Sequence, residues 1–218
     1  MSLTKLDIDR FISTLRTKSK EFNSINNVQL ASMLEETISN INEVAYFWAT
    51  ISSDNKGTTK TPAEGEEWVG GPYAAVLATQ YYRDTLIDDS DLNESKYNEQ
   101  ENSYNVFPNN MIERISFPFI NAKVYFNKSM SFEDINLYRG FSKRYDIDPS
   151  ITLVLGAGNY SSIPYLDVIY HLVTRRSVIL LKLNPVNEYL KPVFEKVFQN
   201  FIERGYIIVT TGTVSYTH

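Results

Sequence analysis

The pattern of apolar and polar positions predicts a helical first part of the chain. Apolar residues recur at helical spacing over Leu3–Leu15 and again over Leu30–Trp48, which predicts two helices, the second about five turns long. Ser53–Gly65 is rich in Lys, Thr, Gly and Pro and predicts a loop. A third helical pattern covers Glu66–Ile87 and is interrupted by Gly70-Gly71-Pro72. We therefore expect two helices there, or one helix with a kink.

The middle of the chain carries weaker patterns. Asp88–Asn105 is acidic, rich in Asn and nearly free of apolar residues, which predicts a solvated loop. Val106–Phe126 carries alternating apolar residues and predicts an extended pair or hairpin, in which Pro118 must lie on an edge or in a bulge. Ser131–Asp134 matches a capping box, so we expect a helix from there to about Arg144.

The last part of the chain alternates strand and helix patterns. Ile151–Leu155 is a short apolar run, and the polar turn Gly156–Pro164 leads from it into a helix. Ser177–Leu183 repeats the apolar run, Val186–Arg204 reads as a long amphipathic helix, and Tyr206–Val209 as a third strand. Pro192 should kink that helix or mark its true start nearer Tyr189. This order predicts a βαβαβ unit. Strands that are apolar on both faces need helices on both sides, which favours a parallel, doubly wound sheet.

Together these patterns predict an α/β chain with three parts and a short tail. We expect a helical amino-terminal region at 1–105 and an extended hairpin with a connecting helix at 106–150. Residues 151–212 are predicted to form the first βαβαβ half of a Rossmann-like, doubly wound parallel sheet. Val214–His218 resembles a translated transposon-end adapter of sequencing libraries, so we expect 213–218 to be a non-native tail.

Composition and charge narrow the function classes. The chain has 218 residues, of which 43% are hydrophobic and 22% charged, and this balance is typical of a globular protein with a sizeable core. A net charge of −5 argues against nucleic-acid binding. The sequence lacks an apolar run long enough for a membrane span and an apolar leader, so we expect a cytoplasmic protein without a membrane partner.

Few side chains suit nucleophilic or metal chemistry. These 218 residues contain no cysteine, which excludes disulfides, thiolate metal sites and a cysteine nucleophile within them. The histidines are His171 and His218. His171 lies in an apolar helical run, where we expect a core histidine bonded to the backbone rather than a ligand or base. We predict no metal site.

Gly156 and Gly158 lie at the turn from strand to helix. Glycines there allow close approaches that a side chain would block, and a helix beginning near Pro164 offers free N–H groups to an anion. The dinucleotide fingerprint needs a third glycine, but Ser161 holds that position. A phosphate-binding loop and a purely structural tight turn both remain open, and the second is favoured.

Lys182 replaces the acidic residue with which a standard Rossmann unit ends its second strand. It lies among apolar neighbours at the carboxyl end of the strand, the edge where open α/β sheets bind ligands. A lysine there either extends to solvent or donates to a ligand, and the residues alone leave both readings open.

Four segments resemble the start of the cofactor-binding domain of the aldehyde dehydrogenase superfamily. They are Leu153–Pro164, Leu180–Pro185, Glu203–Tyr206 and Thr211-Gly212. In that family a strand runs into a Pro-Trp-Asn-x-Pro loop, a second strand ends in Lys-Pro-Ser-Glu, and a glycine closes the third strand.

The resemblance implies roles for individual residues. Asn159 matches the asparagine that helps to hold the substrate oxyanion, and Lys182 matches the lysine that bonds the adenosine ribose; an amide donor and an ammonium group suit these roles. Gly156, Gly158 and Asn184 are the accompanying cofactor-binding candidates, although the family has tryptophan where Gly158 stands. The implied cofactor is NAD or NADP, the implied substrate an aldehyde or acyl compound, and the implied parent a homo-oligomer.

The family sequence continues into a pyrophosphate-binding turn, a glutamate base, a cysteine nucleophile and a second domain. Because these 218 residues contain no cysteine, we expect a fragment of an NAD(P)-dependent, aldehyde dehydrogenase-like oxidoreductase that is inactive alone. It would serve aldehyde oxidation or acyl reduction. The alternative is a non-catalytic α/β domain that binds a nucleotide or a protein partner.

Overall fold

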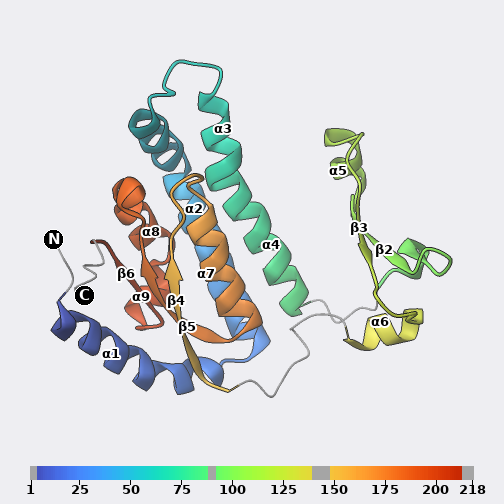
Figure 1. The fold of residues 1–218 in the computed structure, drawn as a ribbon, viewed down its shortest axis with the longest axis horizontal. Helices are drawn as coiled ribbons and strands as arrows, with labels where there is room; N and C mark the ends of the chain where they lie inside the picture. The colour runs from blue at the N-terminus through green and yellow to red at the C-terminus, as the bar shows by residue number, and fades with distance from the viewer. Residues whose placement is uncertain (1–3, 88–91, 139–147, 213–218) are drawn as a thin grey trace. The chain divides into compact units, whose positions relative to one another are not determined.

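A computed structural model describes residues 4–87, 92–138 and 148–212. The chain forms two compact units (Figure 1). The larger unit combines residues 1–88 with 144–218, and the smaller unit covers 89–143. This division differs from the predicted boundaries at 105 and 150, because the helical first part packs directly on the strand–helix part instead of forming a region of its own.

The elements of the larger unit follow the predicted order. Its helices are α1 (Lys5–Asn23), α2 (Asn27–Lys56), α3 (Glu64–Trp68), the π-helical turn η1 (Val69–Tyr73), α4 (Ala74–Ile87), α7 (Ile163–Thr174), the 3-10 segment η3 (Pro185–Leu190), α8 (Lys191–Val197) and α9 (Gln199–Glu203). Its strands are β4 (Ser150–Leu155), β5 (Ser177–Lys182) and β6 (Ile207–Thr210). The α/β fold class is thereby confirmed.

Local capping explains where the first two helices begin and end. Thr4 and Asp7 form a capping box that starts α1, and Asn26 and Gln29 form the same motif at the start of α2. Helix α2 ends at Gly57, whose φ of 70° is the left-handed conformation that glycine adopts freely. The predicted loop therefore begins after Lys56 and not at Ser53.

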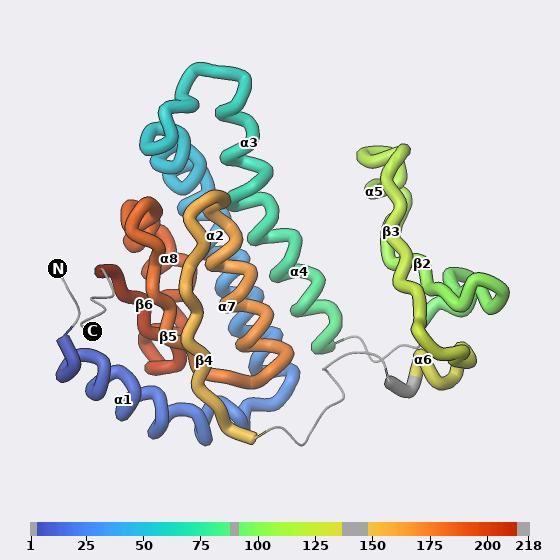
Figure 2. The backbone as a smooth tube through the Cα atoms, in the orientation of Figure 1, coloured from blue at the N-terminus to red at the C-terminus, as the bar shows by residue number. Residues whose placement is uncertain are grey.

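The predicted interruption of the third helical pattern is confirmed. Helices α3 and α4 are joined by η1, in which Gly71 has the non-helical angles φ −123° and ψ −110° and Pro72 lacks an N–H donor. A kinked path from α3 to α4 results (Figure 2).

The parallel sheet has the order β4-β5-β6. Leu153 pairs with Leu180 and Leu180 with Ile208, so the register is continuous across the three strands. The central strand β5 is buried along its whole length except at Lys182. Helices α1 and α7 both pack on β4 and β5, and α4 lies beside α2 and α7 (Figure 1).

The predicted long helix over Val186–Arg204 is divided into three segments, and α8 begins at Lys191, next to the interruption expected at Pro192. The chain forms η3, α8 and α9 there, because Asn187 is non-helical, Pro192 in the first turn of α8 cannot donate to a preceding turn, and Phe198 leaves helical geometry between α8 and α9. The apolar stripe still faces the core, where the rings of Trp48, Tyr165, Phe194 and Phe198 meet.

The smaller unit contains an antiparallel sheet with the order β1-β2-β3. Its elements are the 3-10 turn η2 (Glu94–Lys96), β1 (Tyr97–Asn98), β2 (Ser103–Phe107), α5 (Met111–Ser116), β3 (Ala122–Tyr125) and α6 (Phe132–Tyr138). Of the predicted extended pair, the second run forms β3, which pairs with β2 rather than with residues 115–119, and the capping box Ser131–Asp134 starts α6 as predicted. Any continuation of α6 to Arg144 lies outside the described residues.

Two predictions for this unit are wrong. The expected solvated loop at 88–105 contains η2, β1 and the start of β2, because asparagine amides replace apolar contacts: the Asn102 side chain donates to the carbonyls of Phe126 and Lys128 at 2.6 and 2.8 Å. In the expected hairpin, α5 separates the two strands because Asn110 caps it with a bond from the Glu113 N–H. Pro118 therefore follows a helix and lies in no strand.

Within the described part of the chain, every helix is too short or too polar to cross a lipid bilayer. The predicted non-native tail at 213–218 lies outside that part.

Candidate functional site

The predicted site residues lie along one edge of the parallel sheet. Strands β4, β5 and β6 run in the same direction, so the segments that follow them meet at the carboxyl edge. Lys182 pairs with Leu155 of β4 and with Thr210 of β6, which places it at the centre of this edge. Gly156, Gly158 and Asn159 follow β4, and Asn184 follows β5.

Both glycines are required by close packing of neighbouring loops. The Gly156 N–H donates to the Lys182 carbonyl at 2.9 Å, and a Cβ at Gly156 would lie 3.3 Å from that oxygen. A Cβ at Gly158 would lie 2.9 Å from Val186 Cγ2 and 3.2 Å from the Asn184 amide. Protein atoms thus line the space beside these glycines, which supports the reading of a structural tight turn.

Hydrogen bonds tie together the segments that follow the three strands. Asn184 caps η3 by accepting from the Val186 N–H at 3.1 Å. The buried Asn187 donates to the Ala157 carbonyl at 3.0 Å, and Glu188 accepts from the Gly212 N–H at 2.8 Å. The Asn184 side chain therefore has a structural role in the described protein, which the order Asn-Pro in the sequence could have indicated.

Asn159 and Lys182 differ from these neighbours because their side chains make no bond within the described protein. Asn159 is exposed and Lys182 is half-buried, and neither side chain hydrogen-bonds or ion-pairs with any residue in the described ranges. The structure thus places an amide in the segment that follows β4 and an ammonium group on the last residue of the adjacent strand β5, and both groups are able to donate.

The amino-terminal helices hold the segment that carries Asn159, which we call the β4–α7 loop (Gly156–Ser162; Figure 2). Trp48 of α2 donates its indole N–H to Ser161 Oγ at 3.0 Å, and the Ser162 N–H donates to the Gly70 carbonyl at 3.2 Å. Sequence reasoning missed these contacts because it placed Trp48 only in an apolar stripe. The sequence did carry one indication of such a contact, because the N–H of a buried tryptophan needs a hydrogen-bond acceptor.

Burial shifts the pKa values of two side chains on α7. The pKa of Tyr165 is raised by complete burial, and its hydroxyl bonds Thr79 of α4 at 2.5 Å. Burial lowers the pKa of His171, whose Nδ1 has no hydrogen-bond partner in the described protein. The predicted backbone bond to this ring nitrogen is therefore absent. His171 contacts Tyr170 edge-on and takes no part in the site.

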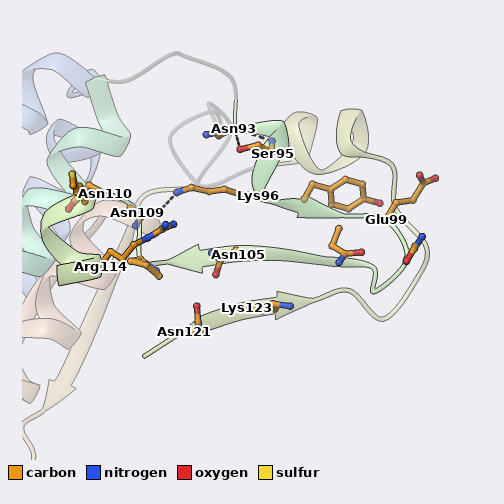
Figure 3. A pocket seen from close by; sticks show the side chains of 15 residues that line it. Asn93, Ser95, Lys96, Glu99, Asn105, Asn109, Asn110, Arg114, Asn121 and Lys123 are labelled. Carbon is orange, nitrogen blue, oxygen red and sulfur yellow. Dashed lines mark hydrogen bonds between the residues drawn. The ribbon is translucent and has the colours of Figure 1, made fainter. Parts of the chain in front are cut away.

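The smaller unit has an open cavity of about 1050 Å³, whose lining includes six asparagines together with Lys96, Arg114 and Lys123 (Figure 3). Lys96 already donates to Asn109 Oδ1 at 2.7 Å, as the dashed line in Figure 3 shows, and Lys123 pairs with Glu101 at 2.6 Å. The hydrogen bond from Lys123 holds the pKa of Glu101 below its usual value. With two of its three cations engaged, this cavity is a weaker candidate than the sheet edge. Sequence reasoning assigned no function to it.

Among the residues that the structure describes, no three acidic or histidine side chains lie close enough to hold a metal ion. Comparison with known proteins adds no assignment. No protein-family model matches the sequence, and a search of curated proteins finds no significant match.

Proposed function

We propose that residues 151–212 are the cofactor-binding part of an NAD(P)-dependent oxidoreductase of the aldehyde dehydrogenase type, acting on an aldehyde or acyl substrate. One observation carries this assignment. At the carboxyl edge of a parallel sheet, Asn184, Asn187 and Glu188 are engaged in holding the loops, whereas Asn159 and Lys182 have no partner in the described protein. Donors left unpaired at such an edge fit a bound ligand.

Each group suits a particular part of the substrate and cofactor. The Asn159 amide N–H donates to the oxygen on which negative charge develops when a carbonyl is attacked. Lys182, half-buried on β5 and without a carboxylate partner among the described residues, donates to the ribose hydroxyls of the adenosine. The nicotinamide ring, when bound, accepts or delivers the hydride. The attacking nucleophile is not supplied by these 218 residues, so we expect no turnover from them alone.

Replacing Lys182 with methionine should weaken the binding of NAD or NADP to this chain by about tenfold to a hundredfold, because hydrogen bonds from a charged donor are lost while the stem volume is kept. Isothermal titration calorimetry measures the affinity. Lys191→Met is the matched control, since the Lys191 side chain is 41% exposed on α8 and pairs with Glu195 at 3.5 Å. Failure of both nucleotides to bind the unaltered chain at millimolar concentration, or equal losses in the two variants, would contradict the role of Lys182.

The catalytic half of the proposal needs a separate assay. The full-length gene product is mixed with NAD or NADP and a series of aldehydes, or with reduced cofactor and acyl thioesters, and the absorbance of reduced nicotinamide is followed. We expect a change with at least one substrate and its loss in the Asn159→Ala variant. Cofactor binding without turnover of any substrate would favour the alternative, a non-catalytic nucleotide-binding domain.

A further inference from the structure

The β4–α7 loop is fixed on both sides of Asn159 but not at Asn159 itself. Before it, the Ala157 carbonyl accepts from Asn187 Nδ2 at 3.0 Å. After it, Ser161 Oγ accepts from Trp48 Nε1 at 3.0 Å and the Ser162 N–H donates to the Gly70 carbonyl at 3.2 Å. The Asn159 side chain has no partner in the described protein, so these flanking bonds are what restrain the backbone that carries its amide.

The bond between Trp48 and Ser161 is buried and joins residues 113 positions apart. Both side chains have zero exposed surface. The indole lies edge-on to Tyr165 and Phe194 at ring-centroid distances of 6.1 and 5.5 Å, so its N–H direction is fixed by the core. A buried donor aimed in one direction restrains its acceptor, and Ser161 is two residues from Asn159.

Two glycines of η1 form the surface on which the rest of the loop lies. A Cβ at Gly70 would lie 2.5 Å from Cδ1 of Tyr160, the neighbour of Asn159. A Cβ at Gly71 would lie 3.0 Å from Ser161 Oγ. Side chains of the loop therefore approach η1 so closely that a Cβ at either glycine would require Tyr160 or Ser161 to shift. Short π-helical turns of this kind often occur at functional sites.

We infer that Trp48 and Gly70, acting through Ser161, Ser162 and Tyr160, are positioning residues for the Asn159 amide. This inference rests on the proposed role of Asn159. It gives the amino-terminal helices a part in the site: α2 and η1 orient the donor that the β4–α7 loop presents. Preorganised donors contribute more than mobile ones, because they need no reorientation as charge develops.

The test compares Trp48→Phe, Ser161→Ala and the double variant, with Ser19→Ala as control. Ser19 is also buried, but its hydroxyl bonds the Arg16 carbonyl of its own helix. In 15N relaxation without ligand, we expect the order parameter of the Asn159 backbone amide to fall from about 0.85 to below about 0.6 in all three loop variants and to stay unchanged in the control. Side-chain amide resonances of Asn159 should narrow in parallel.

The double variant separates positioning from stability. Each single variant leaves one buried polar group unpaired, whereas the double variant leaves neither, so the thermal midpoint should partly recover. We expect Asn159 to remain mobile in the double variant nevertheless. Two results would overturn the inference and leave the bond a purely structural one. In the first, the order parameter of Asn159 recovers together with the thermal midpoint in the double variant. In the second, the order parameter of Asn159 is unchanged in all variants.

A second, independent variant is Gly70→Ala, whose Cβ displaces the Tyr160 ring and should shift the amide resonances of Asn159 and Tyr160. Gly65→Ala in α3 is the matched control, because a Cβ there meets no atom within 4 Å. Unshifted resonances in a folded Gly70→Ala protein would count against the contact. Since none of these measurements includes a ligand, their failure is distinct from failure of the chain to bind NAD or NADP.

Discussion

Replacing Phe198 with alanine is expected to lower the free energy of unfolding of the larger unit by about 3–5 kcal/mol. Phe198 has zero exposed surface and stacks on Tyr165 with 5.0 Å between ring centroids and 10° between planes. It lies between α8 and α9 and also contacts Phe194 at 6.2 Å. Truncation removes an aromatic side chain from a site whose neighbours belong to separate elements, so a cavity should remain.

Urea denaturation followed by circular dichroism measures this loss. Phe119→Ala is the matched control, because Phe119 is 94% exposed and its removal should change stability by less than about 0.5 kcal/mol. In the Phe198 variant, the signals of the amino-terminal helices and of the parallel sheet should move together. Separate transitions, with the helices of residues 4–87 melting at an unchanged midpoint, would contradict their membership of one cooperative unit.

Replacing Lys56 with methionine is the second large expected effect. Lys56 Nζ contacts both carboxylate oxygens of Glu67 at 2.9 and 2.8 Å, and the Glu67 side chain is only 9% exposed. Removing the ammonium group leaves a buried carboxylate without its cation, which should cost about 2–3 kcal/mol; the partial exposure of Lys56 keeps the loss below that of a fully buried pair.

The double variant Lys56→Met/Glu67→Met should recover most of this loss, because two apolar side chains replace both charges. Lys191→Met, which breaks the exposed pair with Glu195, should cost less than about 1 kcal/mol. Chemical denaturation at low and high salt provides the comparison. Equal losses from the Lys56 and Lys191 variants would show that burial of Glu67 adds nothing to the strength of its pair.

The local parts of the fold follow from local chemistry. Apolar spacing and capping residues predicted α1 and α2, because a capping box involves side chains and N–H groups only three positions apart. The strands β4, β5 and β6 were predicted from continuous apolar runs. Burial on both faces holds for β5, whereas Leu153 and Leu155 of β4 are exposed. The interruption at η1 was predicted because Pro72 lacks a donor and Gly71 tolerates unusual angles.

Other elements could not be predicted from the spacing of apolar residues. The stripe over Val186–Arg204 is apolar at helical spacing, yet three short segments bury it as well as one helix would. The strands near Asn102 carry few apolar residues, and amide bonds to backbone carbonyls hold them instead. Hydrophobic pattern reports which side chains are buried, but it does not report hydrogen bonds between distant polar groups.

In the candidate site, too, local features followed from the sequence and contacts between distant residues did not. Sequence alone determined that a glycine-containing turn follows β4 and that Asn159 and Lys182 lie at the carboxyl ends of strands, because strand runs and turn residues are local signals. Only the tertiary structure decided that Trp48 and Gly70 hold the β4–α7 loop. A hydrogen bond across 113 positions depends on how α2 packs, and packing is a property of the whole core rather than of any segment.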